Sequence, residues 1–378
     1  MSRLLNASIR RLLMTADAVG GVWIYALDLA RALARHGVAA TLAVLGPPPS
    51  DAQRREAENI KNLKLVLTDA PLEWLCDDEA RVRGAAGLLA ELARDVGADL
   101  VQLNGAPFAA DADYPAPVVA VQHSCLATWW AAVNDGPAPP EWRWRADLTR
   151  RHLDAADRVV APTAAFADLV ASVYGLGKRI DVVHNGRSRS SVAPTGRTLD
   201  ALFTAGRLWD EGKNVATLDR VAALVDAPFF AAGPCAGPNG TRIASRNLQL
   251  LAELASDDVR VWLAKRPIFV SSALYEPFGL TALEAAQAGC ALVLSDIPTF
   301  RELWDGAALF APARDENAFA SAATTLLEDR LLRRRLERAA HERARRYKLE
   351  AMGQRMVALY DELVGKGAPA PSHSEHAA

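Results

Sequence analysis

The sequence has little that would tie it to nucleic acid or to the interior of a bilayer. Lys and Arg number 43 against 45 Asp and Glu in 378 residues, so the formal net charge is −2. Binding to a phosphate backbone requires a basic surplus, so nucleic acid is not an expected partner. No run approaches the roughly 18 apolar residues of a membrane-spanning helix. The amino terminus also lacks the apolar core of a signal peptide.

Cysteine is scarce and its spacing does not fit a metal site. The four cysteines, Cys76, Cys125, Cys235 and Cys290, form no C-x-x-C pair. This pattern predicts neither a disulfide framework nor a zinc site. We expect reduced thiols packed as small apolar side chains in a cytoplasmic protein. A G-x-G-x-x-G pattern is missing after the first expected strand, which reads into "TADAVGGVW", and this argues against a dinucleotide-dependent oxidoreductase.

Short apolar runs alternate with helical patterns along most of the chain. "IRRLLMTA" and "VAATLAVLG" indicate strands, and "GGVWIYALDLARALARHG" between them indicates a loop and a helix. This order predicts a right-handed βαβ unit in a parallel sheet. The runs "ADLVQLN", "APVVAVQHS", "DRVVAPT" and "RIDVVHNG" show no polar alternation. They are typical of strands that are covered on both faces.

A segment rich in Ser, Arg, Pro and Gly, residues 187–200, interrupts this rhythm and is predicted to be a linker. Strands at "ALFTAGR", "APFFAAG", "RPIFVSS" and "CALVLSD" then alternate with helices again. Because a single core seldom grows beyond roughly 250–300 residues, we predict an α/β protein with two doubly wound, Rossmann-like domains facing across a cleft. Their expected ranges are 1–186 and 201–347.

Residues 314–364 have a mostly helical pattern, and a final helix at about 348–364 is expected to pack back on the first domain. The run "EDRLLRRRLERAAHERARRY" places Leu332, Leu336 and either Ala339 or Ala340 for burial. Its arginines, with Glu337 and Glu342, predict a solvated and ion-paired face, and contact with an anionic membrane is the alternative. The tail, residues 365–378, is expected to be disordered.

Two glutamates, Glu276 and Glu284, stand eight positions apart in "LYEPFGLTALEAAQAGCALVLSD". The stretch follows an expected strand, so it should lie at the carboxyl edge of a sheet, where nucleotides tend to bind. A helix from about Thr281 would aim its positive amino terminus at an anion such as a diphosphate. Both carboxylates could then accept hydrogen bonds from vicinal hydroxyls of one long ligand. A capping box of Thr281 and Glu284 is the purely structural alternative.

Two cations lie in the glycine-punctuated loop "FTAGRLWDEGKN", which follows another expected strand. Arg207 and Lys213 at this edge would neutralise a departing nucleoside diphosphate, although loop charges with no ligand remain the alternative. The acidic stretches "DDEA", "DADY" and "SDD" stand in no persuasive setting for a metal. We therefore expect no metal and no cofactor.

These stretches together resemble a known family of enzymes. "AGRLWDEGKN" and the E-x7-E of Glu276 and Glu284 are similar to the second half of retaining glycosyltransferases with the GT-B fold, and most of all to family 4. The similarity extends to "VGGVWIYALDLARALARHG", "VVAPT" and "VVHNG", so it spans nearly the whole chain.

The resemblance implies a metal-independent transfer of a sugar from a nucleotide-sugar donor to an acceptor hydroxyl. It implies that Arg207 and Lys213 hold the diphosphate, that Glu284 binds the ribose hydroxyls and that Glu276 contacts the donor hexose. The amides of Phe278, Gly279, Leu280 and Thr281 would line the sugar and phosphate, and those of Gly20 and Gly21 would approach from the first domain. Front-face attack is the usual proposal for retention, and double displacement is the alternative.

Two further features bear on the substrates. His123 follows a first-domain strand, where the resemblance implies that it faces the donor sugar; a strand-end histidine without substrate contact is the alternative. The segment 128–151 contains Trp129, Trp130, Trp142 and Trp144. These could stack on a sugar or lipid-linked acceptor or touch lipid headgroups, but core packing of at least two is the simpler expectation.

Two other functions are compatible with the same fold. A glycogen- or starch-synthase-like glucosyltransferase would normally carry Lys-Thr-Gly-Gly where this chain has Ala18-Val-Gly-Gly. A nucleotide-sugar-binding protein without transfer would share the same donor residues. We expect the protein to act in glycan, polysaccharide or glycolipid synthesis, in the cytoplasm or at the inner face of a membrane. The nucleotide, the sugar, the acceptor and the oligomeric state are not predicted.

Overall fold

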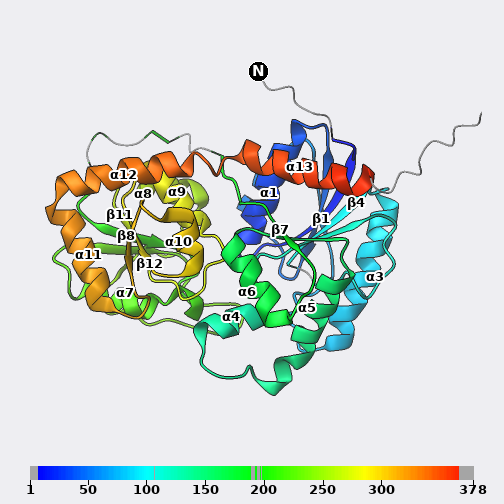
Figure 1. Cartoon of the computed structure of the whole chain (residues 1–378), viewed down its shortest axis with the longest axis horizontal. Helices are drawn as coiled ribbons and strands as arrows, with labels where there is room; N and C mark the ends of the chain where they lie inside the picture. The colour runs from blue at the N-terminus through cyan, green and yellow to red at the C-terminus, as the bar shows by residue number, and fades with distance from the viewer. Residues whose placement is uncertain (1–6, 106, 189–191, 194–195, 197, 366–378) are drawn as a thin grey trace, which may run out of the picture.

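A computed structural model describes residues 7–105, 107–188, 192, 193, 196 and 198–365. Two lobes lie side by side, and each is a parallel sheet with helices on both faces (Figure 1). The prediction of two doubly wound, Rossmann-like α/β halves is therefore confirmed. Much of the predicted linker, and the predicted tail apart from Gly365, lie outside the described residues.

The first lobe is built on a seven-stranded sheet with the order β3-β2-β1-β4-β5-β6-β7. Its strands are β1 (Arg11–Asp17), β2 (Ala39–Leu45), β3 (Leu63–Leu67), β4 (Leu100–Asn104), β5 (Val118–Val121), β6 (Arg158–Ala161) and β7 (Ile180–Val182). Its helical elements are α1 (Gly21–Ala34), α2 (Asp51–Glu58), α3 (Glu79–Asp95), α4 (Leu126–Val133), the 3-10 turn η1 (Pro140–Trp142), α5 (Arg143–Ala155), α6 (Ala164–Tyr174) and, from the end of the chain, α13 (Leu349–Gly365).

The second lobe has a six-stranded sheet with the order β10-β9-β8-β11-β12-β13. Its strands are β8 (Leu202–Ala205), β9 (Phe229–Ala232), β10 (Gln249–Leu250), β11 (Ile268–Ser271), β12 (Leu292–Ser295) and β13 (Leu309–Ala311). Its helical elements are η2 (Glu211–Lys213), α7 (Val215–Ala222), α8 (Ser256–Ala264), α9 (Leu280–Ala288), α10 (Pro298–Trp304), α11 (Glu316–Glu328) and α12 (Arg330–Ala344).

Both sheets reverse their strand order next to the first strand of the lobe, between β1 and β4 and between β8 and β11. Ligands of open α/β sheets bind at such switch points, outside the carboxyl ends of the strands. The loops after β1, β8 and β11 are the ones that carry the glycine pair, the two cations and the first glutamate. The topology therefore places these three loops at the two switch points.

Successive side chains of a strand pack in separate cores on the two faces of each sheet. In β1, Leu12 and Met14 pack in the core that contains α1 and α13, whereas Leu13 packs in the core that contains α3, α5 and α6. Strand side chains alternate in direction, so a strand covered on both faces needs an unbroken apolar run. This explains why these strands lack polar alternation.

The last helix crosses back to the first lobe and packs against α1 (Figure 1). Gly353 allows the close approach, because a Cβ there would lie 2.7 Å from the Cβ of Ala32. Covering by α13 also explains why α1 is buried around most of its surface and not along one stripe only. None of the helices in the described part of the chain has the length and apolar character to cross a bilayer.

The expectation of a solvated face on α12 is wrong at Arg333 and Glu337. Leu336 and Ala340 are buried as predicted, but Arg333 is only 3% exposed and Glu337 is buried beside it. The Arg333 guanidinium donates to Asp200 at 2.8 Å and to the backbone carbonyls of Leu199 and Arg266. A periodic pattern could not reveal this, because the carbonyls that hold the guanidinium come from distant loops.

Candidate active site

The lobes meet at a cleft of about 400 Å³ that lies at the carboxyl ends of both sheets. Every residue that the sequence assigned to catalysis or donor binding lines this cleft: Gly20, Gly21, His123, Arg207, Lys213, Glu276, Phe278, Gly279, Leu280, Thr281 and Glu284. They belong to loops and helix starts that follow β1, β5, β8 and β11. The structure thus brings the predicted residues together, while the role of each stays a prediction.

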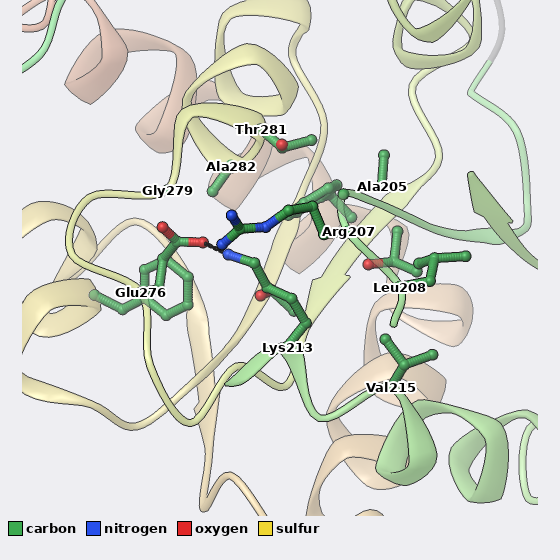
Figure 2. A pocket seen from close by; sticks show the side chains of 14 residues that line it. Ala205, Arg207, Leu208, Lys213, Val215, Glu276, Gly279, Thr281 and Ala282 are labelled. Atoms are coloured by element: carbon green, nitrogen blue, oxygen red, sulfur yellow. Dashed lines mark hydrogen bonds and ion pairs between the residues drawn. The ribbon is translucent and has the colours of Figure 1, made fainter. Parts of the chain in front are cut away.

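Two cations and a carboxylate converge at the base of the cleft. Figure 2 shows Arg207, Lys213 and Glu276 around a hollow of about 50 Å³. Lys213 Nζ lies 2.5 Å from Glu276 Oε2, and Arg207 Nη2 donates to Asp210 Oδ2 at 2.8 Å. Burial alone would raise the pKa of Asp210, but the charges of Arg207 and Lys213 outweigh burial and lower it. In the free protein, each cation is therefore neutralised by a carboxylate.

A residue in the left-handed conformation fixes the loop that carries Lys213. Asn214, with φ of 52°, joins η2 to α7. Its side-chain amide donates to the carbonyls of Ser272 at 3.0 Å and Ala313 at 2.6 Å. Asparagine is one of the few non-glycine residues that tolerate this conformation. The loop after β8 is thereby tied to the loop after β11, which carries Glu276.

The loop with Glu276 ends at Gly279, the N-cap of α9. Gly279 has φ of 87°, and no side chain caps the helix. The loop is held from the first lobe, because the Thr163 hydroxyl donates to the carbonyl of Pro277 at 2.9 Å. The first N–H groups of α9 therefore have no side-chain acceptor and open toward the cleft. A helix amino terminus in this state attracts an anion.

Glu284 lines the cleft, and its surroundings differ from those expected of a capping residue. It is the fifth residue of α9 and not part of the first turn, and the capping box with Thr281 is wrong because Gly279 is the N-cap. Its Oε1 accepts a hydrogen bond from Arg187 Nη2. Arg187 Nη1 donates to Asp28 Oδ2 of α1 at 2.6 Å, so one guanidinium joins carboxylates from the two lobes.

This Arg187 triad, formed by Asp28, Arg187 and Glu284, is buried. Arg187 is 4% exposed and Asp28 is fully buried. Burial alone would lower the pKa of Arg187, but the carboxylates of Glu284 and Asp28 outweigh it and raise the pKa. The sequence analysis missed Arg187 because it opens the Ser- and Arg-rich stretch that was assigned to a linker.

His123 stands on the first-lobe wall of the cleft, after β5. Its Nε2 lies 3.4 Å from Asn104 Oδ1, and its ring meets the edge of Tyr25 with centroids 4.3 Å apart. Burial lowers the pKa of His123 to about 3. The imidazole is therefore neutral at physiological pH, so it can exchange a hydrogen bond with a sugar hydroxyl but carries no charge toward a phosphate.

The glycine pair lets the first lobe approach the cations closely. A Cβ on Gly20 would lie 3.1 Å from Arg207 Nη1, and one on Gly21 would lie 3.5 Å from Cδ1 of Leu280. Any side chain at position 20 would thus occupy the space next to the Arg207 guanidinium. Close approach to a ligand or to the facing lobe is a common reason for glycine in such a loop.

The tryptophans of the segment 128–151 lie in different surroundings. Trp129 and Trp142 line a second cavity of about 390 Å³ beside the cleft, and Trp129 Nε1 donates to Asp210 Oδ1 of the other lobe at 3.0 Å. Trp130 packs edge-on against Trp142, and Trp144 stacks on the Arg145 guanidinium. Trp74 and Trp209 also line the second cavity. Sequence analysis missed these two because they lie outside the tryptophan-rich segment.

Among the residues that the structure describes, no group of three or more His, Cys, Asp and Glu side chains is placed to hold a metal ion.

Comparison with known proteins agrees with this geometry. The sequence pattern described as Glycosyltransferase Family 4 matches residues 19–190, and the pattern described as Glycosyl transferases group 1 matches residues 200–329. These two ranges correspond to most of the two lobes. The chain is a glycosyltransferase.

Curated relatives of this glycosyltransferase include a D-inositol 3-phosphate glycosyltransferase of Xylanimonas cellulosilytica, with 27% identity over 92% of each chain. The GDP-mannose:cellobiosyl-diphosphopolyprenol alpha-mannosyltransferase of Xanthomonas oryzae pv. oryzae is 32% identical over 42% of this chain and 46% of that protein. The phosphatidyl-myo-inositol mannosyltransferase of Mycolicibacterium smegmatis is 36% identical over 24% of each chain.

Solved structures confirm the GT-B fold of the glycosyltransferase. The sucrose-phosphate synthase of Thermosynechococcus elongatus superimposes with a TM-score of 0.78 at 18% identity, over 94% of this chain and all of that one. HepE of Anabaena, solved with UDP and glucose, gives a TM-score of 0.71 at 15% identity, over 93% of this chain and all of that one.

Proposed function

We propose that this glycosyltransferase moves a sugar from a nucleoside diphosphate donor to an acceptor hydroxyl, with retention at the anomeric carbon and without a metal ion. The observation that carries the proposal is the convergence of Arg207, Lys213 and the uncapped start of α9 on one hollow. Two positive side chains and a helix amino terminus supply the charge that a diphosphate requires. HepE, which has the same fold, was solved with UDP-glucose, which is a donor of this chemical class.

The reaction breaks the bond between the anomeric carbon and the β-phosphate oxygen, and the electron pair leaves with the diphosphate. Arg207, Lys213 and the α9 amides stabilise that negative charge. Lys213 exchanges Glu276 for a phosphate oxygen when the donor enters, and Glu276 becomes free to accept hydrogen bonds from the donor hexose. Glu284 keeps one oxygen on Arg187 and offers the other to the ribose hydroxyls.

Retention follows when the acceptor attacks from the face that the diphosphate leaves. In this path a phosphate oxygen takes the proton from the acceptor hydroxyl, and the new glycosidic bond forms on the same face. Neutral His123 orients a donor hydroxyl without competing for the phosphate. The glycine pair, Gly20 and Gly21, leaves space beside Arg207 for the diphosphate and brings the first lobe to the reacting carbon.

The product is proposed to be a glycan, polysaccharide or glycolipid. By their names, the relatives glycosylate inositol 3-phosphate, phosphatidylinositol or a diphosphopolyprenol-linked glycan. The four cysteines are free thiols, which suits a reducing compartment. We therefore place the reaction in the cytoplasm, with peripheral contact to the inner face of a membrane when the acceptor is lipid-linked.

A screen of nucleotide sugars tests this proposal. UDP-glucose, UDP-N-acetylglucosamine and GDP-mannose are added separately, and the melting temperature and the release of UDP or GDP are measured. A donor that binds the native state raises its melting temperature, and turnover distinguishes transfer from simple binding. Turnover should persist in excess EDTA. Activity that EDTA abolishes and a divalent cation restores would contradict the metal-free mechanism, and binding without turnover would indicate a nucleotide-sugar-binding protein.

A further inference from the structure

The second cavity adjoins the donor cleft and has no assigned ligand. It measures about 390 Å³, and both lobes contribute to its walls. Asp17, His123, Arg207 and Tyr275 line the cavity and the cleft alike. A molecule in the cavity would therefore reach His123 and the reacting end of the donor. This position suits the acceptor.

Flat aromatic surfaces dominate one part of its lining. Trp74 of the first lobe and Trp209 of the second stack with centroids 6.5 Å apart and an interplanar angle of 22°. Trp129 and Trp142 also line the cavity, and Trp74, Trp129 and Trp142 each keep part of their surface exposed. A pyranose ring presents an apolar face of C–H groups, which packs well on an exposed indole.

The charged groups of the cavity are predominantly acidic. Five carboxylates line it against two guanidinium groups: Asp17, Glu73, Asp77, Asp210 and Glu211 against Arg145 and Arg207. The Arg145 guanidinium donates hydrogen bonds to Asp77 at 2.6 Å and to the backbone carbonyls of Glu73 and Cys76. Arg207 is occupied by Asp210, and no lysine is among the described lining residues. A phosphate group here would have to displace a carboxylate from one of these guanidinium groups while it faces three further carboxylates of the lining, although phosphate recognition normally depends on accessible cations.

One of these carboxylates, that of Glu73, accepts a hydrogen bond from its own backbone amide. Glu73 is 9% exposed, and no other described residue donates to its side-chain oxygens. Burial, together with the nearby Asp17 charge, raises the pKa of Glu73 to about 7. A carboxylate has more acceptor positions than this one amide fills, and a sugar hydroxyl that enters the cavity would donate to a remaining one.

We propose that this cavity is the acceptor site and that it selects an uncharged sugar, with the ring on Trp74 and Trp142 and a hydroxyl donated to Glu73. It disfavours acceptors that carry a phosphate on the sugar that enters. A lipid or diphosphate-linked glycan remains an acceptor when its terminal sugar is neutral. The inference rests on the proposed function, since it takes the adjoining cleft as the donor site.

A direct binding comparison tests the selection without relying on turnover. Methyl glucoside and methyl glucoside 6-phosphate are titrated against the full chain in the presence of UDP, with saturation-transfer NMR to detect ring protons near the indoles. The neutral sugar should bind at least about tenfold more tightly, the size expected for one unfavourable charge contact. Equal or tighter binding of the phosphorylated sugar overturns the proposal. UDP-sugar turnover is measured separately, so failure of the donor assignment is distinguishable.

Charge reversal in the exposed part of the cavity wall gives a second test that does not endanger the fold. Asp77→Lys adds a cation to the wall and removes the carboxylate from Arg145, so binding of the phosphorylated sugar should improve at least about fivefold. Asp95→Lys, at the exposed end of α3 and away from the cavity, is the matched control and should change nothing. Identical binding by the two variants overturns the proposal.

A variant of Glu73, the buried carboxylate, gives a third test. Glu73→Leu should weaken the neutral sugar about tenfold because it removes the hydroxyl acceptor. Glu141→Leu, at the exposed η1 turn and outside the cavity lining, is its control. Melting curves establish that Glu73→Leu is folded. Unchanged affinity in a folded Glu73→Leu protein counts against the assignment of this residue.

Discussion

At the scale of single residues, the ion pair of Lys213 and Glu276 links the free protein to the donor complex. At 2.5 Å the two charges satisfy one another while the cleft is empty of donor. A diphosphate carries more charge than one carboxylate, so it displaces Glu276 from Lys213 and leaves the glutamate next to the incoming hexose. The pair thus keeps both charges compensated before the donor arrives.

Lys213→Met tests the importance of this cation. We expect kcat/KM for transfer to fall about 10²–10³-fold, the typical loss when one group that stabilises developing charge is removed. The fold should persist because the Lys213 side chain is partly exposed and forms no part of a core. Transfer is measured by release of the nucleoside diphosphate. Lys61→Met, at an exposed site of the first lobe, is the control, and near-normal turnover in Lys213→Met would refute its assignment.

At the scale of elements, the start of α9 depends on a backbone conformation that favours glycine. Gly279→Ala would place a Cβ 2.8 Å from Cε1 of Phe300 at a residue with φ of 87°. We expect a loss of about 1–2 kcal/mol in the free energy of unfolding from the left-handed conformation. Donor affinity should fall as well, because the first amides of α9 shift.

Gly289→Ala provides the matched control for this change. Gly289 ends the same helix with φ of 83°, but it does not line the cleft. Both variants should lose stability in urea unfolding, and only Gly279→Ala should lose affinity for the donor in calorimetric titration. Equal donor affinities in the two variants would show that the helix start does not bind the anion.

Helix α5 contains a buried histidine that makes stability depend on pH. His152 is 1% exposed, its Nδ1 accepts from the Ala109 amide at 3.1 Å, and burial, with a smaller effect of Lys178, lowers its pKa to about 3. The unfolded chain binds this proton below about pH 6.5, so folded-state stability is full above that pH and declines as pH falls toward 3.

We expect His152 to account for about 2 kcal/mol of the stability lost between pH 7 and pH 5. His152→Gln keeps a hydrogen-bond acceptor but cannot take up the proton. The variant will be less stable than the wild type at pH 7. The difference between its free energies of unfolding at pH 7 and at pH 5, measured with urea, should nevertheless be smaller than in the wild type by about 2 kcal/mol. The same pH difference in the variant and the wild type would rule out this explanation.

Elements with strong local patterns were predictable from sequence, and contacts between distant segments were not. The loops after β8 and β11 stand beside one another because parallel strands end at the same edge, so the proximity of Arg207, Lys213 and Glu276 followed from the strand order. The partner of Glu284 did not follow, because Arg187 lies in a segment whose composition indicated only a linker. Strand β10, of two residues, is too short for any pattern.

At the scale of the whole molecule, several buried or partly buried polar contacts hold the lobes together. Besides the Arg187 triad, Thr128 hydrogen bonds Tyr275 across the lobes at 2.8 Å. Glu302 of α10 accepts from the first amides of α6 and from His184. His184 therefore joins the end of the first lobe to α10 of the second.

Arg187→Met tests the triad. The change removes the cation that Asp28 and Glu284 share and leaves Asp28 with Arg31 alone, at 3.1 Å, so the free energy of unfolding should fall by about 3–5 kcal/mol. Donor affinity should also fall because Glu284 loses the contact that orients it. The double variant Arg187→Met, Asp28→Leu should recover part of the stability but not the affinity, because the buried Asp28 carboxylate is gone, Arg31 keeps its ion pair with Glu56, and Glu284 remains unsupported.

Melting temperature and calorimetric donor titration separate these two effects. A single variant as stable as the wild type would show that the triad contributes nothing to folding. Full recovery of donor affinity in the double variant would show that Arg187 does not orient Glu284.

The chain passes between the lobes twice, and the two passages touch. The Arg187 amide donates to the carbonyl of Tyr347 at 3.2 Å, and Arg187 and Lys348 form a parallel bridge. Gly186 lies so close to the returning segment that a Cβ would be 2.3 Å from the carbonyl oxygen of Lys348. Domain motions are absorbed by a few residues in loops or at the ends of elements, so any change in the angle between the lobes has to be taken up by these two adjoining segments, beside the buried Arg187.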